Sequence, residues 1–423
     1  MKGCYKRTYS SHNGQVGIIV TAILSLALFS LTGCLTDPEP EPQPTISALS
    51  SSEIFSSSEI ISSSSSSLTP TPESLSSAPD LYFSVLSSSS ELPPSIPESP
   101  SKPEAYSKTI IDGISILVDT TFFIEKFHTP SVKIVFKDDE TGALNYIEMN
   151  RNLFRHEIIP TPEEPNHPQF SPDGSKIAFS SQYEGSPQPS SALYVIDLAS
   201  AEHFIYKLDV ASAAIPRWRI LDNGDTAILF NDYTGSNKSF QWNNSGTYVV
   251  TYSNNTFGTP QKIFNRSYNG GVSYDNTLAV TGSSKLLFHY ATDNDTTNID
   301  MYNEEQVCNV SISRDSSKIV SFLETRGSMG MQFTQNRRYN WHQYIFYMDA
   351  MGSFLKAIKA DDGYVFNGTE WLFLPGYQVS TVTSSNDLTE SIVLIDYEMG
   401  SYYTIVNAPG KQIDYPDIWA GGR

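Results

Sequence analysis

The sequence has few of the residues that build metal centres. Its 423 residues include only three cysteines and seven histidines, and Cys308 is the one cysteine far from the N-terminus. No HExxH motif occurs, and no two histidines of the body have a close metal-ligand spacing. A lone cysteine cannot build a structural zinc site. We therefore expect no metal and no cofactor.

Basic residues are also scarce. The chain has 27 Lys and Arg against 46 Asp and Glu, which gives a formal net charge of −19. A nucleic-acid-binding domain needs a positive surface to neutralise phosphates. The charge therefore excludes nucleic acid as a partner, and it opposes flat adsorption to an anionic bilayer.

Motifs of common enzyme classes are missing. There is no G-x-S-x-G elbow, since Gly282-Ser283-Ser284 lacks the second glycine, and there is no glycine-rich phosphate loop. From this we expect that the chain is not an enzyme. The paired carboxylates of a glycosidase or polysaccharide lyase cannot be located from sequence spacing. A carbohydrate-active enzyme on this scaffold therefore remains the alternative.

The N-terminus carries an export signal. Lys2, Lys6 and Arg7 precede an apolar run over residues 16–31, which is typical of a signal peptide. The run ends in Leu31-Thr32-Gly33-Cys34, which resembles the lipobox of bacterial lipoproteins. The resemblance implies a signal peptide of residues 1–33, cleavage after Gly33 and lipidation of Cys34. An uncleaved membrane anchor is the alternative.

The residue after the lipidated cysteine bears on the location. Position 35 is Leu rather than Asp. By resemblance to the lipoprotein sorting pattern of some bacteria with two membranes, this implies the outer membrane. The lipid at Cys34 would supply more than the two signals that stable membrane attachment requires. We expect a cell-envelope protein that is attached to the membrane through its N-terminal lipid.

Residues 34–105 are of low complexity. An acidic proline run at 37–42 is followed by serine blocks, such as 62–67 and 87–90. Such a segment cannot bury enough apolar surface to offset its ordering entropy, so we expect a disordered Ser-rich tether. As a flexible coil of about 70 residues it would reach roughly 45 Å.

From Tyr106 onward, short apolar runs alternate with turn residues. Strand-like runs include 115–118, 132–136 and 143–147, and no long apolar period of 3.6 residues occurs. Aromatic and β-branched residues are frequent in these runs. This pattern is typical of an all-β domain, which we expect to cover residues 106–423.

One stretch, His167–Phe179, combines an apolar approach, the turn Ser171-Pro172-Asp173-Gly174 and a second strand-like run. Pro sets one turn dihedral, Asp can accept hydrogen bonds from the amides ahead of it, and Gly adopts positive φ freely. A similar stretch recurs around Asp315. The stretch resembles the PD40 (WD40-like) repeat of TolB-like β-propellers. The resemblance implies a propeller in which Asp173, Gly174 and Asp315 are structural turn residues.

Weaker copies of this stretch begin near Pro216, Gly271, Phe366 and Tyr415. Their spacings are typical of four-stranded blades, so we predict a six-bladed TolB-like β-propeller. The last copy lies close to the C-terminus. Strands between residues 110 and 149 must therefore complete its blade and close the ring, which hides the sheet edges. A seven-bladed ring or two stacked sheets are the alternatives.

One long loop contains residues that are typical of binding sites. It spans residues 324–343 and carries five candidate binding residues, namely Arg337, Arg338, Tyr339, Trp341 and His342. Long loops on rigid scaffolds often bind ligands, and Arg, Tyr and Trp are frequent anchors. An ordinary loop, with its tryptophan packed on the blade, is the simpler interpretation.

The resemblance implies a binding role rather than a specific chemistry, because a propeller fold hosts many functions. We expect a lipid-anchored envelope protein whose propeller recognises a protein or polysaccharide partner, or serves as a scaffold in an envelope complex. Carboxylates that converge with His or Arg in the central channel would favour catalysis. An exposed rim over residues 337–342 would favour binding.

Overall fold

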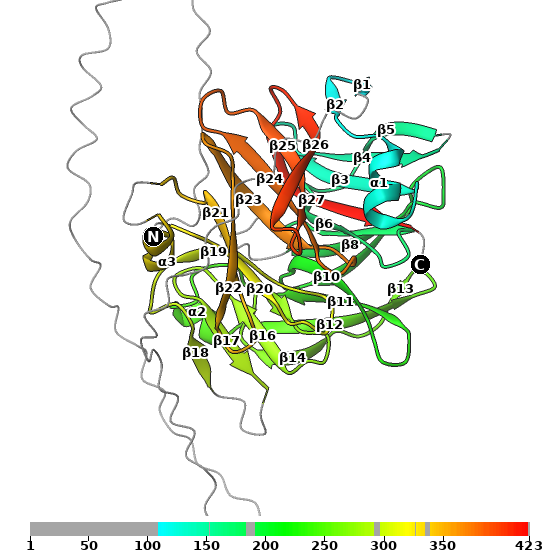
Figure 1. The fold of residues 1–423 in the computed structure, drawn as a ribbon. Helices are drawn as coiled ribbons and strands as arrows, with labels where there is room; N and C mark the ends of the chain where they lie inside the picture. The colour runs from blue at the N-terminus through cyan, green and yellow to red at the C-terminus, as the bar shows by residue number, and fades with distance from the viewer. Residues whose placement is uncertain are drawn as a thin grey trace, which may run out of the picture. The chain divides into compact units, whose positions relative to one another are not determined.

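The computed structural model describes residues 109–151, 153–182, 191–291, 297–325, 327–334 and 339–421. The expected signal peptide, Cys34, the tether and the candidate residues Arg337 and Arg338 lie outside the described residues. The described residues form six antiparallel sheets (Figure 1). This arrangement confirms the six-bladed β-propeller, and the seven-bladed and stacked-sheet alternatives are wrong.

In each of the first three blades the strands are given in order from the inner strand outward. Blade one contains β27 (Ile413–Ala420), β3 (Val132–Asp138), β4 (Ala143–Asn150) and β5 (Leu153–Ile159). Blade two contains β6 (Asn166–Phe170), β7 (Lys176–Ser180), β8 (Ser191–Asp197) and β9 (Ile205–Val210). Blade three contains β10 (Ala214–Ile220), β11 (Thr226–Asn231), β12 (Gly246–Ser253), β13 (Thr256–Phe257) and β14 (Gln261–Asn265).

The remaining blades follow in chain order. Blade four contains β15 (Gly271–Val272), β16 (Leu278–Thr281), β17 (Leu287–Tyr290) and β18 (Asn298–Asp300). Blade five contains β19 (Val307–Ile312), β20 (Val320–Glu324), β21 (Tyr344–Met348) and β22 (Phe354–Lys359). Blade six contains β23 (Tyr364–Trp371), β24 (Tyr377–Ser384), β25 (Glu390–Asp396), β26 (Ser401–Ala408), β2 (Ile114–Ile116) and β1 (Thr109–Ile111). Three short helices are described, namely α1 (Thr120–Phe127), α2 (Phe240–Asn243) and α3 (Ser328–Phe333).

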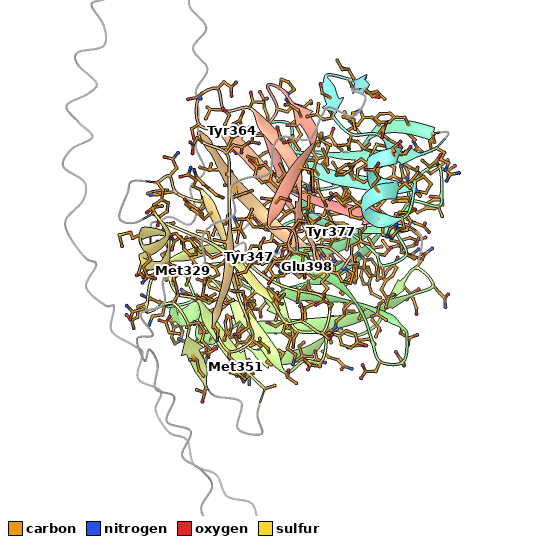
Figure 2. All side chains as sticks on the ribbon, in the orientation of Figure 1. Met329, Tyr347, Met351, Tyr364, Tyr377 and Glu398 are labelled. Carbon is orange, nitrogen blue, oxygen red and sulfur yellow. The ribbon has the colours of Figure 1, made fainter. Side chains whose placement is uncertain are left out.

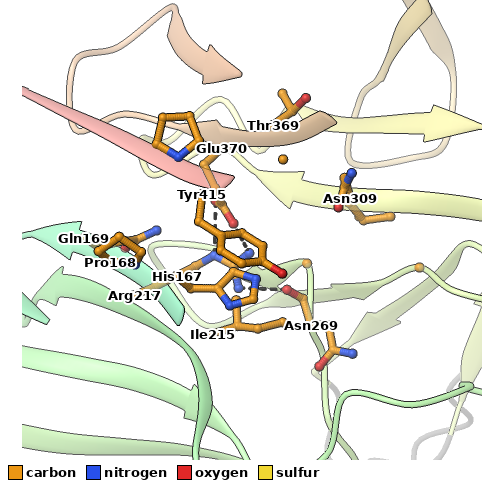
Figure 3. Close-up of a pocket in the computed structure, with 15 residues that line it drawn as sticks. His167, Pro168, Gln169, Ile215, Arg217, Asn269, Asn309, Thr369, Glu370 and Tyr415 are labelled. Atoms are coloured by element: carbon orange, nitrogen blue, oxygen red, sulfur yellow. Dashed lines mark hydrogen bonds and ion pairs between the residues drawn. The ribbon is translucent and has the colours of Figure 1, made fainter. Parts of the chain in front are cut away.

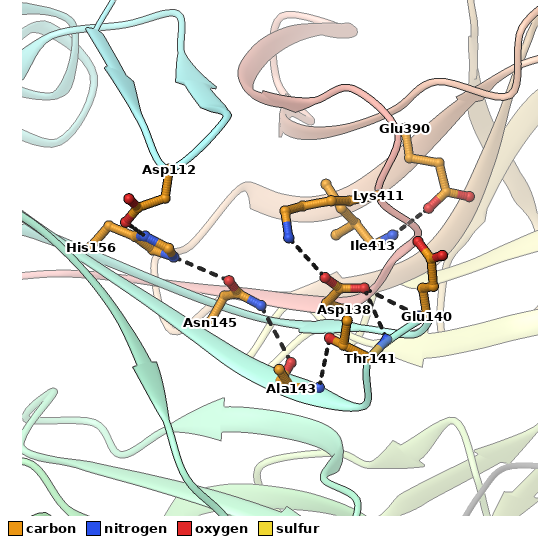
Figure 4. Close-up of polar contacts among 10 residues, drawn as sticks. All are labelled: Asp112, Asp138, Glu140, Thr141, Ala143, Asn145, His156, Glu390, Lys411 and Ile413. Carbon is orange, nitrogen blue, oxygen red and sulfur yellow. Dashed lines mark hydrogen bonds and ion pairs between the residues drawn. The ribbon is translucent and has the colours of Figure 1, made fainter.

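The two ends of the propeller chain close the ring. β27 is the inner strand of blade one and pairs with β3, with Ile418 opposite Ile134. β3 and β4 fall in the region expected to complete this blade, whereas its outer strand β5 lies beyond that region. The hairpin β1–β2 does not join them, because β2 pairs with β26 of blade six. A contact of 2.8 Å between Asp112 Oδ2 and His156 Nδ1 ties the hairpin to β5 (Figure 4).

Helix α1 covers the junction between blades six and one. Its N-cap Asp119 accepts hydrogen bonds from the backbone N–H groups of Thr121 and Phe122, at 2.8 and 3.3 Å. Such a cap satisfies donors that have no partner within the helix. Phe122 and Phe123 then pack into one apolar core with side chains of both blades. The N-terminal segment thus holds together the same two blades that β27 and β3 close.

Each blade packs on the next through alternating apolar side chains. Tyr347 of β21 is fully buried, and its hydroxyl donates to Gln378 Oε1 of blade six at 2.7 Å. Figure 2 shows Tyr347 inside the domain, whereas Met351 lies on its surface, where it is 74% exposed. Indole N–H groups also cross between blades, since Trp218 Nε1 donates to Gln169 O and Trp371 Nε1 donates to Ser311 O. Both indole rings are buried, and each indole N–H keeps a hydrogen-bond partner, so their burial stabilises these interfaces.

Candidate functional site

The inner strands share a distortion near their N-terminal ends. In five blades the pairing register shifts across a three-residue step, as it does between Asn166 and Gln169 of β6. The second residue of each step has a left-handed backbone, namely His167 (φ 52°), Ile215 (φ 52°), Asn309 (φ 48°), Gly368 (φ 53°) and Tyr415 (φ 51°). Four of these are not glycine, and a β-branched residue is seldom found there. Such conformations cost about 1–3 kcal/mol each and often occur at functional sites.

The bulges place side chains around a pocket at the propeller axis, which we call the axial pocket (Figure 3). Its cavity volume is about 30 Å³, which is room for about two water molecules. Every blade contributes to its lining, through residues in the inner strand or directly before it. The residues used below are His167, Arg217, Asn269, Asn309, Glu370 and Tyr415. A bulge redirects side chains in this way without ending the strand.

An ion pair crosses the axis and forms the floor of the pocket. Arg217 of blade three and Glu370 of blade six come from opposite positions of the ring, and their side chains form two hydrogen bonds. Arg217 Nη1 also donates to Asn269 O at 2.7 Å. Ser311 Oγ of blade five donates to Glu370 Oε2 at 2.9 Å. Charged groups with this many partners are held rigidly.

Two aromatic rings form one wall. The ring centroids of His167 and Tyr415 lie 3.8 Å apart at an interplanar angle of 34°. In Figure 3 the two rings overlap on one side of the pocket, while Asn309 and Thr369 lie on another. The pocket therefore presents an aromatic surface opposite amide and hydroxyl groups.

Two further charges interact electrostatically with the floor. Burial raises the pKa of Asp417 to about 7, although the charge of Arg314 opposes this shift. The backbone N–H of Phe170 donates to Asp417 Oδ2 at 2.7 Å. Arg314 packs its guanidinium over the ring of Phe373 at 4.5 Å, and burial lowers its pKa. Two cations and two carboxylates thus gather near the axis, and their formal charges balance.

The structure separates the candidate loop residues that it describes. Tyr339 is 8% exposed, and its hydroxyl donates to the buried carboxylate of Glu324, which also accepts from the Tyr302 hydroxyl. Burial raises the pKa of Glu324. His342 has a buried ring whose pKa is lowered by desolvation, and its backbone bonds to Glu324 and to Phe366 of blade six. The described end of the loop is therefore fixed to blade five through the Tyr339 side chain and to blade six through the backbone of His342.

Among the described candidates, Trp341 faces solvent, at 49% exposure. Arg337 and Arg338 lie outside the described residues. None of the three described candidates, Tyr339, Trp341 and His342, lines the axial pocket. The described part of the loop therefore offers one exposed anchor rather than a cluster.

The turn residues make repeated local hydrogen bonds. Asp173 Oδ1 accepts from Ser175 N at 3.0 Å, and Gly174 has φ 67°. Asp315 Oδ1 accepts from Ser317 N at 2.9 Å. Asp275 repeats the contact with Thr277 in blade four. These carboxylates shape the turns that follow the inner strands and do not line the pocket.

Sequence reasoning missed the residues of the axial pocket, although a signal was present. His167-Pro168-Gln169, Ile215-Pro216-Arg217 and Tyr415-Pro416-Asp417 repeat the pattern of a large residue, a proline and a polar residue. Proline lacks the N–H that a strand ladder needs, so within sheets it is confined mainly to edges and bulges. Each proline here directly follows the left-handed residue of a bulge. The pattern therefore marks the inner strands, but not which residues meet.

Two negative findings apply to the described part of the chain. Within the described ranges, no group of three or more His, Cys, Asp or Glu side chains could hold a metal ion. Among the helices described, none has the length and apolarity to cross a membrane.

The comparisons with known proteins identify the fold alone. No protein-family model and no curated protein matches the chain. Similar solved structures include Kuenenia stuttgartiensis hydrazine synthase, with TM-score 0.44 and 9% identity over 69% of this chain and 46% of that one. They also include the β-propeller domain of the Trilobed protease from Pyrococcus furiosus, with TM-score 0.36 and 10% identity over 72% and 83%. A Mycobacterium tuberculosis puromycin-hydrolyzing peptidase has TM-score 0.38 and 12% identity over 72% and 45%.

The chain spans less than half the length of the hydrazine synthase and of the peptidase. At these identities the likeness extends to the propeller and not to an activity. The expectation that the chain is not an enzyme is nevertheless wrong as stated, since propellers of this kind occur in peptidases. The lack of a catalytic motif in the sequence does not exclude an enzyme.

Proposed function

We propose that this chain is a lipid-anchored binding or scaffold protein of the cell envelope, whose propeller recognises a protein or polysaccharide partner at the axial pocket. One observation carries the proposal. All six blades contribute to a single pocket, and left-handed residues line it in five of them. Strain of this kind persists where the surrounding structure enforces it, often at functional sites.

The membrane attachment rests on the sequence. The lipobox ending at Cys34 and the Leu at position 35 support lipidation and the outer membrane. Replacing Cys34 by Ser should abolish incorporation of labelled palmitate and release the protein from the membrane fraction. Cys4→Ser is the matched control, because Cys4 lies within the proposed signal peptide and should not affect labelling. Palmitate incorporation into the Cys34→Ser chain would contradict the anchor.

Recognition at the pocket is tested by capture. The full-length chain, solubilised in detergent, is applied to a glycan array and to solubilised envelope. The array and pull-down are repeated with Tyr415→Gly, which changes the pocket, and with Arg338→Ala/Trp341→Ala, which changes the loop. We expect the pocket variant to lose capture. Loss in the loop variant alone would move the site to the loop, and capture unchanged in both would remove the proposal.

A second candidate function is a carbohydrate-active enzyme, either a polysaccharide lyase or a glycosidase. The observation that favours it is the gathering of Glu370 and Asp417 with Arg217 and Arg314 near the axis. Glycoside cleavage requires carboxylates in two different protonation states, and Asp417 has a raised pKa. Oligosaccharides incubated with the wild type should then be shortened, and Glu370→Gln should bind them without cleaving them. Unchanged oligosaccharides after incubation would contradict catalysis.

A further inference from the structure

We propose that a chloride-sized inorganic anion binds at the propeller axis between Arg314 and Asp417. This inference goes beyond the proposed function, because it concerns a site outside the lining of the axial pocket and involves no macromolecular partner. It rests on a buried guanidinium without hydrogen-bond partners, on a carboxyl group of another blade, and on the balance of charge at the axis.

Arg314 reaches the axis from the end of the inner strands that lies away from the axial pocket. It follows β19, whereas the pocket is lined mainly by residues at the start of the inner strands or directly before them. Its guanidinium carbon lies 4.5 Å from the centroid of the Phe373 ring, and Phe373 follows β23 of blade six. The charges that act on this guanidinium are those of Asp417, Glu370 and Arg217. The side chain therefore lies beside the ion pair of the floor.

Both amino groups of Arg314 are buried, and neither has a hydrogen-bond partner among the described residues. Phe373 covers the guanidinium but supplies no oxygen acceptor, and the Glu370 carboxylate already accepts hydrogen bonds from Arg217 and Ser311. A guanidinium that is removed from water without acceptors destabilises the folded chain. Buried polar groups of this kind nearly always bond to something, which can be an ordered water or an ion.

Asp417 of blade one supplies the other side of the site. Its Oδ2 accepts from the backbone N–H of Phe170, whereas its buried Oδ1 has no partner among the described residues. Arg314 and Asp417 interact electrostatically, but they form neither a hydrogen bond nor an ion pair with each other. A polar contact over a distance too long for a hydrogen bond indicates a bridging water or ion. The site therefore suits a single atom that contacts both side chains.

The charges favour an anion over water. The ion pair of the floor is neutral, so Arg314 and Asp417 decide the balance. Burial raises the pKa of Asp417 to about 7, and the charge of Glu370 acts in the same direction. The charge of Arg314 and the backbone N–H groups of Phe170 and Ile418 oppose this shift. With Asp417 neutral, these groups carry one uncompensated positive charge. The Arg314 amino groups and the Asp417 O–H are then all donors, which suits a halide ion.

Anion binding is therefore coupled to protonation of Asp417. When Asp417 is ionised, its carboxylate compensates the charge of Arg314 and repels an anion. The affinity for chloride should therefore fall as pH rises above about 7, by up to about tenfold per pH unit.

Chloride binding is measured by thermal unfolding of the detergent-solubilised full-length chain. Sodium chloride is titrated at constant ionic strength against sodium isethionate, whose anion is much larger than chloride. Above its Kd, each tenfold increase in chloride should raise Tm by about 2 °C at about pH 6. The chloride concentration that gives the same rise should be about thirtyfold higher at about pH 8.5.

Three variants assign the response to the site. Arg314→Met should abolish the chloride dependence of Tm. Arg219→Met is the matched control, because burial lowers the pKa of both arginines, but the Arg219 amino groups donate to Asn276 Oδ1 and Tyr274 O. This control should keep the chloride dependence. Asp417→Asn removes the titration, so its response to chloride should be the same at both pH values.

The outcomes are distinct. A Tm that is equal in chloride and in isethionate, or a chloride dependence that survives in Arg314→Met, would overturn the site. If Arg314→Met does not fold, wild-type crystals soaked in bromide decide. An anomalous peak beside the Arg314 amino groups would support the anion, and a water there without an anomalous signal would overturn it. A wild-type response that is equal at both pH values would overturn the coupling to Asp417.

Discussion

The side chains of Arg217 and Glu370 are 153 positions apart in the chain and form an ion pair between opposite blades of the propeller. Both side chains are largely buried, at 9% and 16% exposure. Neighbouring blades already share apolar interfaces, but only contacts across the axis couple blades three and six directly. The pair therefore contributes to stability and also forms the floor of the axial pocket.

Removal of either charge should destabilise the fold. Arg217→Met and Glu370→Gln each leave the opposite charge buried without its partner, which typically costs about 3–5 kcal/mol. The double variant Arg217→Met/Glu370→Gln leaves neither charge, so its loss in the free energy of unfolding should be smaller than the sum of the single losses. Urea unfolding of the three variants measures this coupling. Strict additivity would show that the two side chains act independently.

Gly174 has little room for a side chain, because Trp419 of the closing strand lies against it. A Cβ at Gly174 would lie 2.3 Å from the indole, and the backbone there has φ 67°. Trp419 Nε1 donates to Pro172 O of the same turn at 3.0 Å. Gly174→Ala must therefore displace the indole as well as strain the backbone, and should cost about 2–4 kcal/mol.

Gly224 provides the matched control for this substitution. It has φ 86° in the equivalent turn of blade three, but nothing lies within 4 Å of the position that a Cβ would take there. Gly224→Ala should therefore cost only the backbone strain, about 1 kcal/mol. The difference between the two variants is measured by thermal unfolding. Equal losses would mean that the indole contact contributes nothing.

Loss of the closing strand should expose a sheet edge. Without β27, the apolar strand β3 would present unpaired N–H and C=O groups along Val132–Asp138. Such edges template aggregation. A chain that ends at Gln412 should therefore aggregate, whereas a chain that ends at Gly421 should stay soluble and monodisperse by light scattering. A soluble, cooperatively unfolding chain that ends at Gln412 would contradict closure by β27.

Glu390 should make stability depend on pH. Its carboxylate accepts a hydrogen bond from Ile413 N of the closing strand (Figure 4) and another from Thr383 Oγ1. Burial raises its pKa from 4.5 to about 7. Between these values the native chain holds a proton that the unfolded chain has released. The free energy of unfolding should therefore fall as pH rises from about 4.5 to 7, by up to about 3 kcal/mol from this group.

The contribution of Glu390 is isolated by Glu390→Gln, which removes the titration. Urea unfolding across this range should show the wild type losing stability relative to the variant as pH rises. Asp362→Asn is the matched control, because a hydrogen bond from Lys359 lowers the pKa of Asp362 from its usual value of 3.8. That carboxylate is therefore ionised across this range in both the folded and the unfolded chain, and the variant should show the same pH dependence as the wild type. Parallel curves for the wild type and Glu390→Gln would contradict the assignment.

Local sequence patterns predicted the fold well, because each blade is specified by nearby residues. The turn from Ser171 to Ser175 forms hydrogen bonds within five residues, and the same chemistry recurs around Asp275 and Asp315. The position of Tyr415 near the C-terminus required the ring to be closed by strands from the start of the propeller. The hairpin β1–β2 was misplaced, since β2 pairs with blade six rather than completing blade one, and the outer strand β5 was not predicted.

The candidate site could not be predicted in the same way. The composition of the loop from Glu324 to Gln343 is typical of a binding site. Composition does not distinguish Tyr339, which anchors the loop, from the exposed Trp341. That difference depends on a buried carboxylate of β20 and on a tyrosine of blade four's final turn. Glu324 begins the loop, but its burial cannot be read from the loop sequence, and Tyr302 lies outside the loop.

The sequence by itself determined the number of blades and the closure of the ring, because these follow from turn chemistry and apolar alternation that act over a few residues. The tertiary structure alone decided that His167, Arg217, Glu370 and Tyr415 meet at one pocket. Those residues come from four blades, and they converge only because bulges at the same level turn the inner strands toward a common axis.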